Sequence, residues 1–319
     1  MGMNHMRVAK ELIGDNLIAG ADPSARAREE AESRFEVRVF ADYGEMLDQV
    51  KPNAVCVAAP TQLHEQIALD VLEAGCDLLL EKPVAMDAAA AHRIIDKSNS
   101  SGLKMMAGHI ERYNPAVREL RRVLKSGEIG KPLRAAARRL NPGPGRINDV
   151  GVVHDLATHD LDAMDYVLEL KPVRLYAETA NHTSNGREDV LAATIRFADD
   201  VVGSLDVNWL TPTKVRQLAV TGQGGMLVVD YLTQDLVLYR NDFEHTDWQA
   251  LQAFRGTSEG ESVRLKITRQ EPLRVEWEHF LGYVRDELDS SQISDGLQPI
   301  TMAEAVLESA RDNRVIEFE

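Results

Sequence analysis

The sequence predicts two domains: an α/β domain built on a parallel sheet, followed by an α+β domain with a large, mostly antiparallel open sheet. Two observations predict this. Short apolar runs alternate with helical patterns through the first third of the chain, and strand-like runs separated only by turns dominate after about residue 130. The length of 319 residues suits two ordinary domains. We place the boundary after residue 112, which gives domains 1–112 and 113–319.

The apolar runs of the first domain are typical of strands buried on both faces. The segments AVCVAA and DLLLE show no alternation of polar and apolar residues, as expected when helices cover both sides of a parallel sheet. Thr61 and Asp87 stand where helix N-caps are expected. We therefore expect strands at 17–21, 53–59, 76–80 and 104–108, and helices at 24–34, 61–74 and 87–100.

The second domain is expected to begin its sheet near residue 133. Ala198-Asp199-Asp200 and the segment 222–225 have the composition of hairpin turns. Three helices are expected, at 153–170, 274–288 and 301–314. The expected strands are 133–139, 173–180, 190–197, 201–209, 215–221, 226–230 and 236–239.

The bulk composition excludes several classes of partner. The formal net charge of −15 disfavours binding to nucleic acid or to anionic lipid. No apolar run approaches the roughly 20 residues that span a bilayer, and the N-terminus lacks the features of a signal peptide. Cys56 and Cys76 lie in apolar runs, so we expect buried free thiols. By default we expect a cytoplasmic protein.

Two residues follow predicted strands at the edge where parallel sheets bind ligands. A carboxylate at Asp22 can accept hydrogen bonds from both ribose hydroxyls of an adenosine and would repel a 2′-phosphate, which favours NAD over NADP; the alternative is an ordinary turn aspartate. Lys82 can hydrogen-bond a substrate hydroxyl and ease loss of its proton. Other Lys-Pro pairs occur in the chain, so only the preceding strand singles out Lys82.

The segment DVGVVHDLATHDLDAMD, residues 149–165, places Asp155, His159 and Asp162 on one helical face. A histidine suits proton transfer near neutral pH, and a carboxylate one turn away would orient it. One alternative is a solvated acidic face. Another is a metal site using His154, Asp155, His159 and Asp160, but neighbouring side chains point about 100° apart on a helix. We therefore expect no metal.

The junction segment GHIERYNPAV could contact substrate. Arg112 could bind an anionic group, and Tyr113 and Asn114 could hydrogen-bond a sugar; the alternative is an ordinary polar helix start before Pro115. The following loop concentrates three arginines in an acidic chain, which invites a phosphate or is simply solvated. These arginines are Arg138, Arg139 and Arg146.

Taken in order, these motifs resemble the Gfo/Idh/MocA oxidoreductase family over nearly the whole chain. GHIERYNP, the Arg- and Pro-rich loop and DVGVVHDLATHDLD look most like the UDP-N-acetylglucosamine 3-dehydrogenase branch. The other matching landmarks are Ala21-Asp22-Pro23, Pro60-Thr61 with His64, Glu81-Lys82-Pro83, residues 127–132, Asp155 with His159, and EPLRVEWEHF at 271–280.

The resemblance implies a role for each matching residue. Lys82 would assist proton transfer, with a cis bond to Pro83, and His159 would act as acid or base beside Asp155. Whether Lys82 or His159 is the base stays open. Asp22 would hold the adenosine ribose. Pro60, Thr61 and His64 would line the dinucleotide, and Glu81 would approach the nicotinamide ribose. The resemblance also implies a homodimer or homotetramer that pairs through the C-terminal sheet.

The chain departs from the family at its N-terminus. The resemblance implies a Rossmann-type domain that opens with a strand and a Gly-x-Gly-x-x-Gly turn, whereas here Gly2 and Met3 look like the end of that turn. We expect a gap in the sheet, weaker cofactor binding, and a true start upstream of Met1. The leading expectation is an NAD-dependent dehydrogenase of a sugar or UDP-sugar. The alternatives are an inactive sugar-nucleotide-binding or oligomerisation partner, and a metal-dependent hydrolase.

Overall fold

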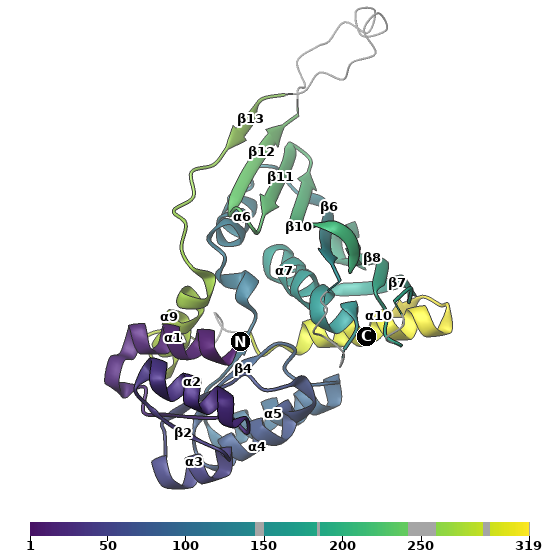
Figure 1. Ribbon diagram of the computed structural model, residues 1–319. Coiled ribbons are helices and arrows are strands. Elements are labelled where there is room, and N and C mark those ends of the chain that lie inside the picture. The colour runs from purple at the N-terminus through teal and green to yellow at the C-terminus, as the bar shows by residue number, and fades with distance from the viewer. Residues whose placement is uncertain (144–149, 184–185, 242–259, 290–293, 319) are drawn as a thin grey trace, which may run out of the picture. The chain divides into compact units, whose positions relative to one another are not determined.

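The computed structural model describes residues 1–143, 150–183, 186–241, 260–289 and 294–318 (Figure 1). The chain forms two compact units. Unit 1 comprises Met1–Tyr113 and Glu271–Thr301, and unit 2 comprises Asn114–Gln270 and Met302–Glu319. The predicted boundary after residue 112 lies next to the observed one. Assigning all later residues to the second domain was wrong, because the chain returns to unit 1 at Glu271.

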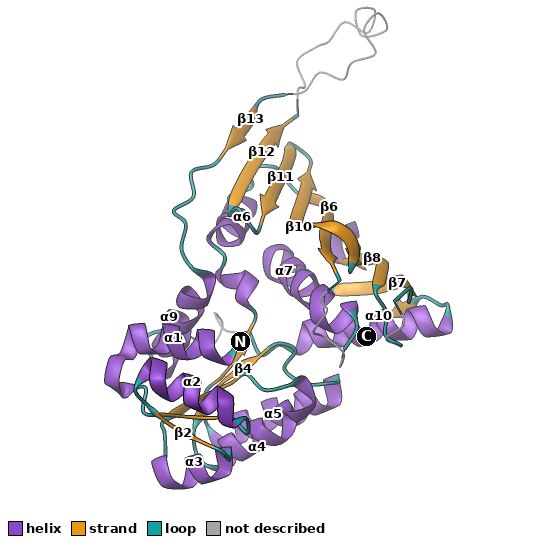
Figure 2. Cartoon of the chain, viewed as in Figure 1, coloured by secondary structure: helices purple, strands orange, loops and turns teal. Residues whose placement is uncertain are grey.

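Unit 1 contains parallel strands and flanking helices, as the sequence predicts (Figure 2). Strand β1 (Ala19–Ala21) pairs with β2 (Arg38–Phe40), and β4 (Asp77–Glu81) lies between β3 (Ala54–Val57) and β5 (Met105–Gly108). Strand β2 and helix α3 are short and were not predicted from the sequence. The helices of unit 1 are α1 (Gly2–Ile13), α2 (Ala25–Phe35), α3 (Tyr43–Val50), α4 (His64–Glu73), α5 (Ala88–Ser101) and α9 (Pro272–Val284).

Local sequence explains where these helices begin. Ser24, Asp42 and Asp87 each accept a backbone N–H of the first turn, so an otherwise unsatisfied donor gains a partner at α2, α3 and α5. Thr61 does not cap α4 as expected; it opens a short 3-10 turn, Thr61–Leu63, before the helix. Strand β4 is apolar on both faces, and Leu78, Leu79 and Leu80 are fully buried.

The parallel strands of unit 1 fall into two separate sheets. Among the described residues, β1 pairs with β2 alone and β3 pairs with β4 alone, so no strand joins β1 to β3. The two sheets nevertheless share one apolar core, in which Phe40 and Ala19 pack with Val57 and Leu80. This division is the gap that the N-terminal departure predicts.

Unit 2 is built on one nine-stranded sheet in the order β13-β12-β11-β10-β6-β9-β8-β7-β14. Only β6 and β9 run parallel; every other neighbouring pair is antiparallel, as expected. The predicted turn at 198–200 is confirmed, and Asp199 and Asp200 both have positive φ. The strands are β6 (Pro132–Pro142), β7 (Pro172–Ala180), β8 (Val190–Phe197), β9 (Val202–Asn208), β10 (Leu210–Gly222), β11 (Gly225–Asp230), β12 (Asp235–Arg240), β13 (Ser262–Arg264) and β14 (Ile316–Glu317).

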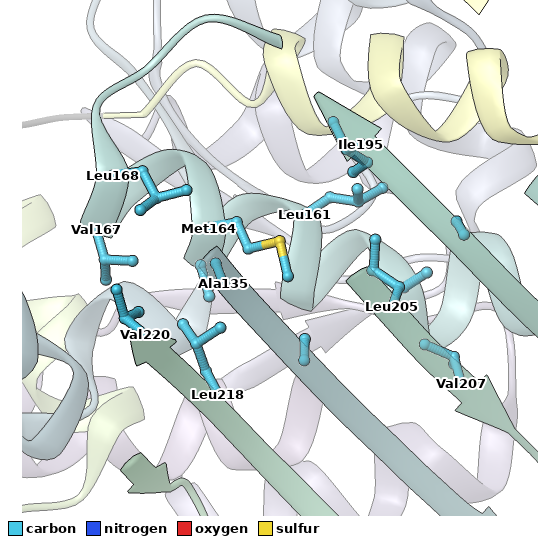
Figure 3. Packing of buried hydrophobic residues seen from close by; sticks show 14 of the residues in the cluster. Ala135, Leu161, Met164, Val167, Leu168, Ile195, Leu205, Val207, Leu218 and Val220 are labelled. Atoms are coloured by element: carbon cyan, nitrogen blue, oxygen red, sulfur yellow. The ribbon is translucent and has the colours of Figure 1, made fainter. Parts of the chain in front are cut away.

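Helices pack on one face of this sheet. They are α6 (Pro115–Lys125), α7 (Thr158–Leu168) and the second half of α10 (Leu297–Asp312). Leu161 and Met164 of α7 meet Ala135, Leu205 and Leu218 from the sheet (Figure 3). The expected helix at 153–170 differs in its first turn, because Val153–Ala157 forms a π-helix before α7 begins.

Candidate active site

The carboxyl ends of the unit 1 strands carry the polar residues that the sequence singled out. Asp22 directly follows β1, Pro60 and Thr61 follow β3, and Lys82 follows Glu81 at the end of β4. In a parallel sheet the carboxyl ends of the strands lie at one edge, where ligands of such sheets bind. Pro60, Thr61 and Lys82 follow strands of the β3-β4-β5 sheet, and Asp22 follows a strand of the β1-β2 sheet. Pro60 is exposed, and Asp22, Thr61 and Lys82 are partly exposed, so all four are accessible to a ligand.

Asp22 is oriented by the turn that leads into α2. Its Oδ1 accepts the backbone N–H of Ser24 at 2.8 Å, while Arg28 donates to the backbone oxygens of Asp22 and Pro23 at 3.0 and 2.9 Å. The guanidinium therefore braces the backbone of the turn. A carboxylate held in this way and partly exposed matches the role expected for an adenosine-ribose acceptor.

Glu81 and Lys82 form the most constrained part of the site. The peptide bond between Lys82 and Pro83 is cis, as the family resemblance implies. Glu81 is buried, and its Oε2 accepts the backbone N–H of Lys82 at 3.1 Å. Burial alone would raise the pKa of Glu81. The hydrogen bond from His5 and the positive charge of Lys82 outweigh burial, and the net effect lowers its pKa. The site therefore holds a carboxylate anion beside Lys82.

The ring of His64 contacts backbone carbonyl groups of two neighbouring loops. Its ring is buried, with Nδ1 2.8 Å from the carbonyl oxygen of Pro83 and Nε2 2.8 Å from that of Ala59. The ring therefore ties the loop after β3 to the segment after β4. The sequence predicts that His64 lines the dinucleotide; in the structure its ring is buried and braces the loop after β3 against the segment after β4.

The start of α1 suits a diphosphate. The helix begins at Gly2, and no side chain caps its first turn. The backbone N–H groups of Gly2 and Met3 thus lie at the positive end of the helix dipole, where anions bind. A Cβ added at Gly2 would meet no atom within 4 Å, so there is room beside the backbone. With Asp22 and Glu81, these donors fit the functional groups of a nicotinamide dinucleotide.

In unit 2, Asp155 and His159 are partly exposed on adjacent turns, Asp155 in the π-helix and His159 in α7. Single π-helical turns often occur at functional sites. Asp160 and Asp162 are fully buried, which contradicts the alternative of a solvated acidic face. Asp160 receives two hydrogen bonds from buried Arg139, Nε to Oδ2 at 2.7 Å and Nη2 to Oδ1 at 3.2 Å.

The alternative metal site on this helix does not assemble. Among the described residues, only one group of His, Cys, Asp or Glu places three ligand atoms within 4.8 Å of one another, and it lies in unit 1. That group is His5, Glu81 and Glu276. The two carboxylate oxygens of Asp160 are instead hydrogen-bonded to Arg139.

The junction residues have internal partners. The Tyr113 hydroxyl donates to Sδ of Met106 at 3.3 Å, and its ring stacks edge-on against His279. Asn114 caps α6 through Oδ1 and donates from Nδ2 to the backbone oxygen of Tyr231. Both are buried, so the structure gives them packing and capping roles in place of the expected contacts to a sugar. Arg112 is partly exposed. Arg146 lies outside the described residues.

Sequence reasoning missed two residues of this site, His5 and Trp277. His5 lies on α1 and is hydrogen-bonded to Glu81, and Trp277 lies on α9 and is hydrogen-bonded to His5. The signal available beforehand was weak, because neither residue lies at a strand end. Cys56 and Cys76 are free thiols; Cys76 is buried as predicted, whereas Cys56 is only partly buried. Burial raises the pKa of both thiols. No helix in the described parts of the chain is both long and apolar enough to cross a bilayer.

Two sequence profiles match the chain. Residues 1–109 match "Oxidoreductase family, NAD-binding Rossmann fold", and residues 117–228 match "GFO/IDH/MocA C-terminal domain". Inositol 2-dehydrogenase 4 of Saccharopolyspora erythraea is 28% identical over 216 residues, which cover 65% of this chain and 63% of that protein. UDP-N-acetylglucosamine 3-dehydrogenase of Acidithiobacillus ferrooxidans is 27% identical over 232 residues, which cover 72% of each chain.

Solved structures share the fold over almost the full chain. UDP-N-acetylglucosamine 3-dehydrogenase from Acidithiobacillus ferrooxidans superposes with a TM-score of 0.83 at 22% identity, covering 98% of this chain and 94% of that one. The WlbA dehydrogenase from Bordetella pertussis, in complex with NADH and UDP-GlcNAcA, gives 0.81 at 21% identity and covers 100% and 95%. With an NAD-binding Rossmann unit followed by this C-terminal domain, the chain belongs to the Gfo/Idh/MocA family of oxidoreductases.

Proposed function

We propose that this protein is an NAD-dependent dehydrogenase acting on a CH–OH group of a sugar or sugar nucleotide. The observation that carries the proposal is the edge of unit 1, where Asp22, the first turn of α1 and the Glu81–Lys82 pair offer groups for the ribose, diphosphate and reacting ends of a dinucleotide. The family profile over residues 1–109 supports NAD as the cofactor.

Bound NAD would supply the hydride acceptor. The chain itself has to hold the substrate hydroxyl and take its proton while the carbinol carbon loses a hydride and becomes a carbonyl carbon. Lys82 and His159 are the candidate bases, and Asp155 would orient or charge His159. Buried Arg139 holds Asp160, the next residue along α7, and so fixes the turn that carries His159.

UDP-N-acetylglucosamine, oxidised at its 3-hydroxyl, is our leading substrate. The relatives include both inositol 2-dehydrogenases and a UDP-N-acetylglucosamine 3-dehydrogenase, and the latter aligns over the larger share of this chain. A turnover screen with NAD and a panel of UDP-sugars, inositols and free hexoses tests this choice. Turnover of inositol but not of any UDP-sugar would refute the substrate while leaving the reaction class intact.

Lys82→Ala tests the assignment of the proton-transfer group. We expect turnover to fall by about 10²–10⁴-fold, with NADH binding retained because the cofactor contacts of Asp22 and the α1 turn are untouched. Turnover is followed by NADH absorbance and binding by nicotinamide fluorescence. If the variant folds normally but no longer binds NADH, Lys82 is a cofactor ligand and the assignment is wrong.

The divided sheet of unit 1 favours a second candidate, an inactive sugar-nucleotide binder or oligomerisation partner. Because no described strand joins β1 to β3, the backbone next to the diphosphate position has less support. This candidate predicts that a UDP-sugar raises the melting temperature whereas NAD and NADH do not. Saturable NADH binding by the same chain would exclude it.

We further propose that the protein forms a homodimer or homotetramer through the sheet face that faces away from α6 and α7. That face presents small and apolar side chains such as Ala192, Val228 and Val237, together with half-exposed Tyr176 and Tyr239. Light scattering tests the proposal, and a monomer at micromolar concentration would contradict it.

A further inference from the structure

A chain of hydrogen bonds runs from α9 through α1 to the end of β4, entirely inside unit 1. Trp277 Nε1 lies 3.0 Å from Nδ1 of His5, and Nε2 of His5 lies 2.7 Å from Oε1 of Glu81. The other carboxylate oxygen, Oε2, accepts the backbone N–H of Lys82. His5 is 3% exposed and Trp277 is 7% exposed, so water does not compete for these bonds.

The indole group of Trp277 fixes which atom donates and which accepts in each of these hydrogen bonds. An indole N–H can only donate, so Nδ1 of His5 must accept and carries no proton. The ring proton therefore lies on Nε2 and is donated to Glu81. A doubly protonated His5 would turn an N–H of its own toward the indole N–H and lose that bond. Trp277 thus selects one tautomer of His5, and that tautomer points a donor at the carboxylate.

A metal site is the competing interpretation of the same residues. His5, Glu81 and fully buried Glu276 lie close enough for three ligand atoms to share an ion. However, a metal-bound histidine offers a bare lone pair. In this structure the bare nitrogen, Nδ1, accepts from Trp277, and the nitrogen that faces Glu81 carries a proton. The geometry therefore favours a hydrogen-bonded relay over a cation site.

We propose that Trp277 and His5 are positioning residues that hold the Glu81 carboxylate in place as the acceptor for a ribose hydroxyl of the bound dinucleotide. This inference rests on the proposed function. Each oxygen of Glu81 receives one donor from the protein, which leaves a lone pair on each for a ligand. Without the His5 donor, a buried carboxylate would turn away or become protonated, and the acceptor would be lost.

Trp277→Phe removes the N–H donor and keeps an aromatic ring in the same apolar cluster. Nitrogen NMR of the histidine rings should show the Nε2-protonated tautomer of His5 in the wild type and a tautomer mixture in the variant. NADH should bind about tenfold more weakly, which corresponds to the loss of one charge-assisted hydrogen bond between a ribose hydroxyl and Glu81. Leu273→Ala, on the same helix and in the same cluster, is the matched control. It should lower the melting temperature but leave the dissociation constant for NADH unchanged.

Substitutions of His5 test the proposal independently. His5→Gln supplies an acceptor and a donor and should restore much of the NADH affinity, whereas His5→Leu should not. Equal NADH affinity in wild type, Trp277→Phe and His5→Leu would overturn the relay. So would stoichiometric zinc bound by the wild type and lost in His5→Leu. If the wild type itself fails to bind NADH, both the proposed function and the role of Glu81 fall, whereas normal binding with insensitive variants overturns the relay alone.

Discussion

The buried ion pair between Arg139 and Asp160 gives a sharp stability prediction. The two side chains are 1% and 0% exposed, and two hydrogen bonds of 2.7 and 3.2 Å join them. The guanidinium also lies 5.3 Å from the centre of the Tyr231 ring. Replacing Arg139 by Met leaves the Asp160 carboxylate buried without its cation. We expect Arg139→Met to lower the free energy of unfolding by about 3–5 kcal/mol.

Denaturant unfolding followed by the fluorescence of Trp209, which is buried in unit 2, measures this loss. The transition midpoint should move to lower denaturant while its slope stays constant. Arg138→Met is the matched control, because the adjacent Arg138 is paired with Asp206 at 3.5 Å with both side chains more than half exposed. Its loss should cost less than about 1 kcal/mol.

The double variant Arg139→Met with Asp160→Leu separates the ion pair from general packing. With both charges removed, stability should return close to the wild-type value, with a coupling energy of at least about 2 kcal/mol. Two additive single effects, or an Arg139→Met variant as stable as the Arg138→Met control, would refute the reasoning. Because Asp160 is next to His159, the single variant should also reduce turnover more than NADH binding.

Two further predictions concern unit 1. Asp22→Asn should weaken NADH binding by about 10- to 100-fold, because charge-assisted hydrogen bonds to the ribose are lost. It should also reduce the preference for NADH over NADPH, as measured by fluorescence titration. Unchanged selectivity would show that Asp22 does not bind the ribose. The hydroxyl of Tyr43 donates to Asp70 at 2.7 Å, and this bond, with burial, raises the pKa of Tyr43 to about 12. A group whose pKa is raised by folding stabilises the fold fully below its ordinary pKa, which is near 10 for tyrosine. This contribution is lost as the pH rises toward 12. Tyr43→Phe should therefore flatten the fall in melting temperature at alkaline pH, and an unchanged slope would contradict this.

Much of the local structure could be predicted because it depends on neighbouring residues. Asp87 caps its helix, as predicted, through a bond to the amide three residues on, and the all-apolar run at Leu78–Leu80 has the composition of a buried parallel strand. Lys82 and Asp22 could be predicted as candidates because strand ends in such sheets carry ligand-binding groups, and both directly follow parallel strands in the structure. The order of the motifs along the chain predicted the family, because the combined order is more specific than any single motif.

The rest of the fold and of the candidate site depends on contacts between residues that are far apart in the sequence. The return of Glu271–Thr301 to unit 1 brings Trp277 to His5, a separation of 272 residues that no local pattern encodes. Likewise, Tyr113 and Asn114 look like exposed polar residues in sequence but are buried by their tertiary partners. The sequence by itself determined the class of the fold and the strand-end residues. Tertiary structure alone decided which polar groups pair in the interior, because the cost of burying a polar group is offset only by a partner that folding brings to it.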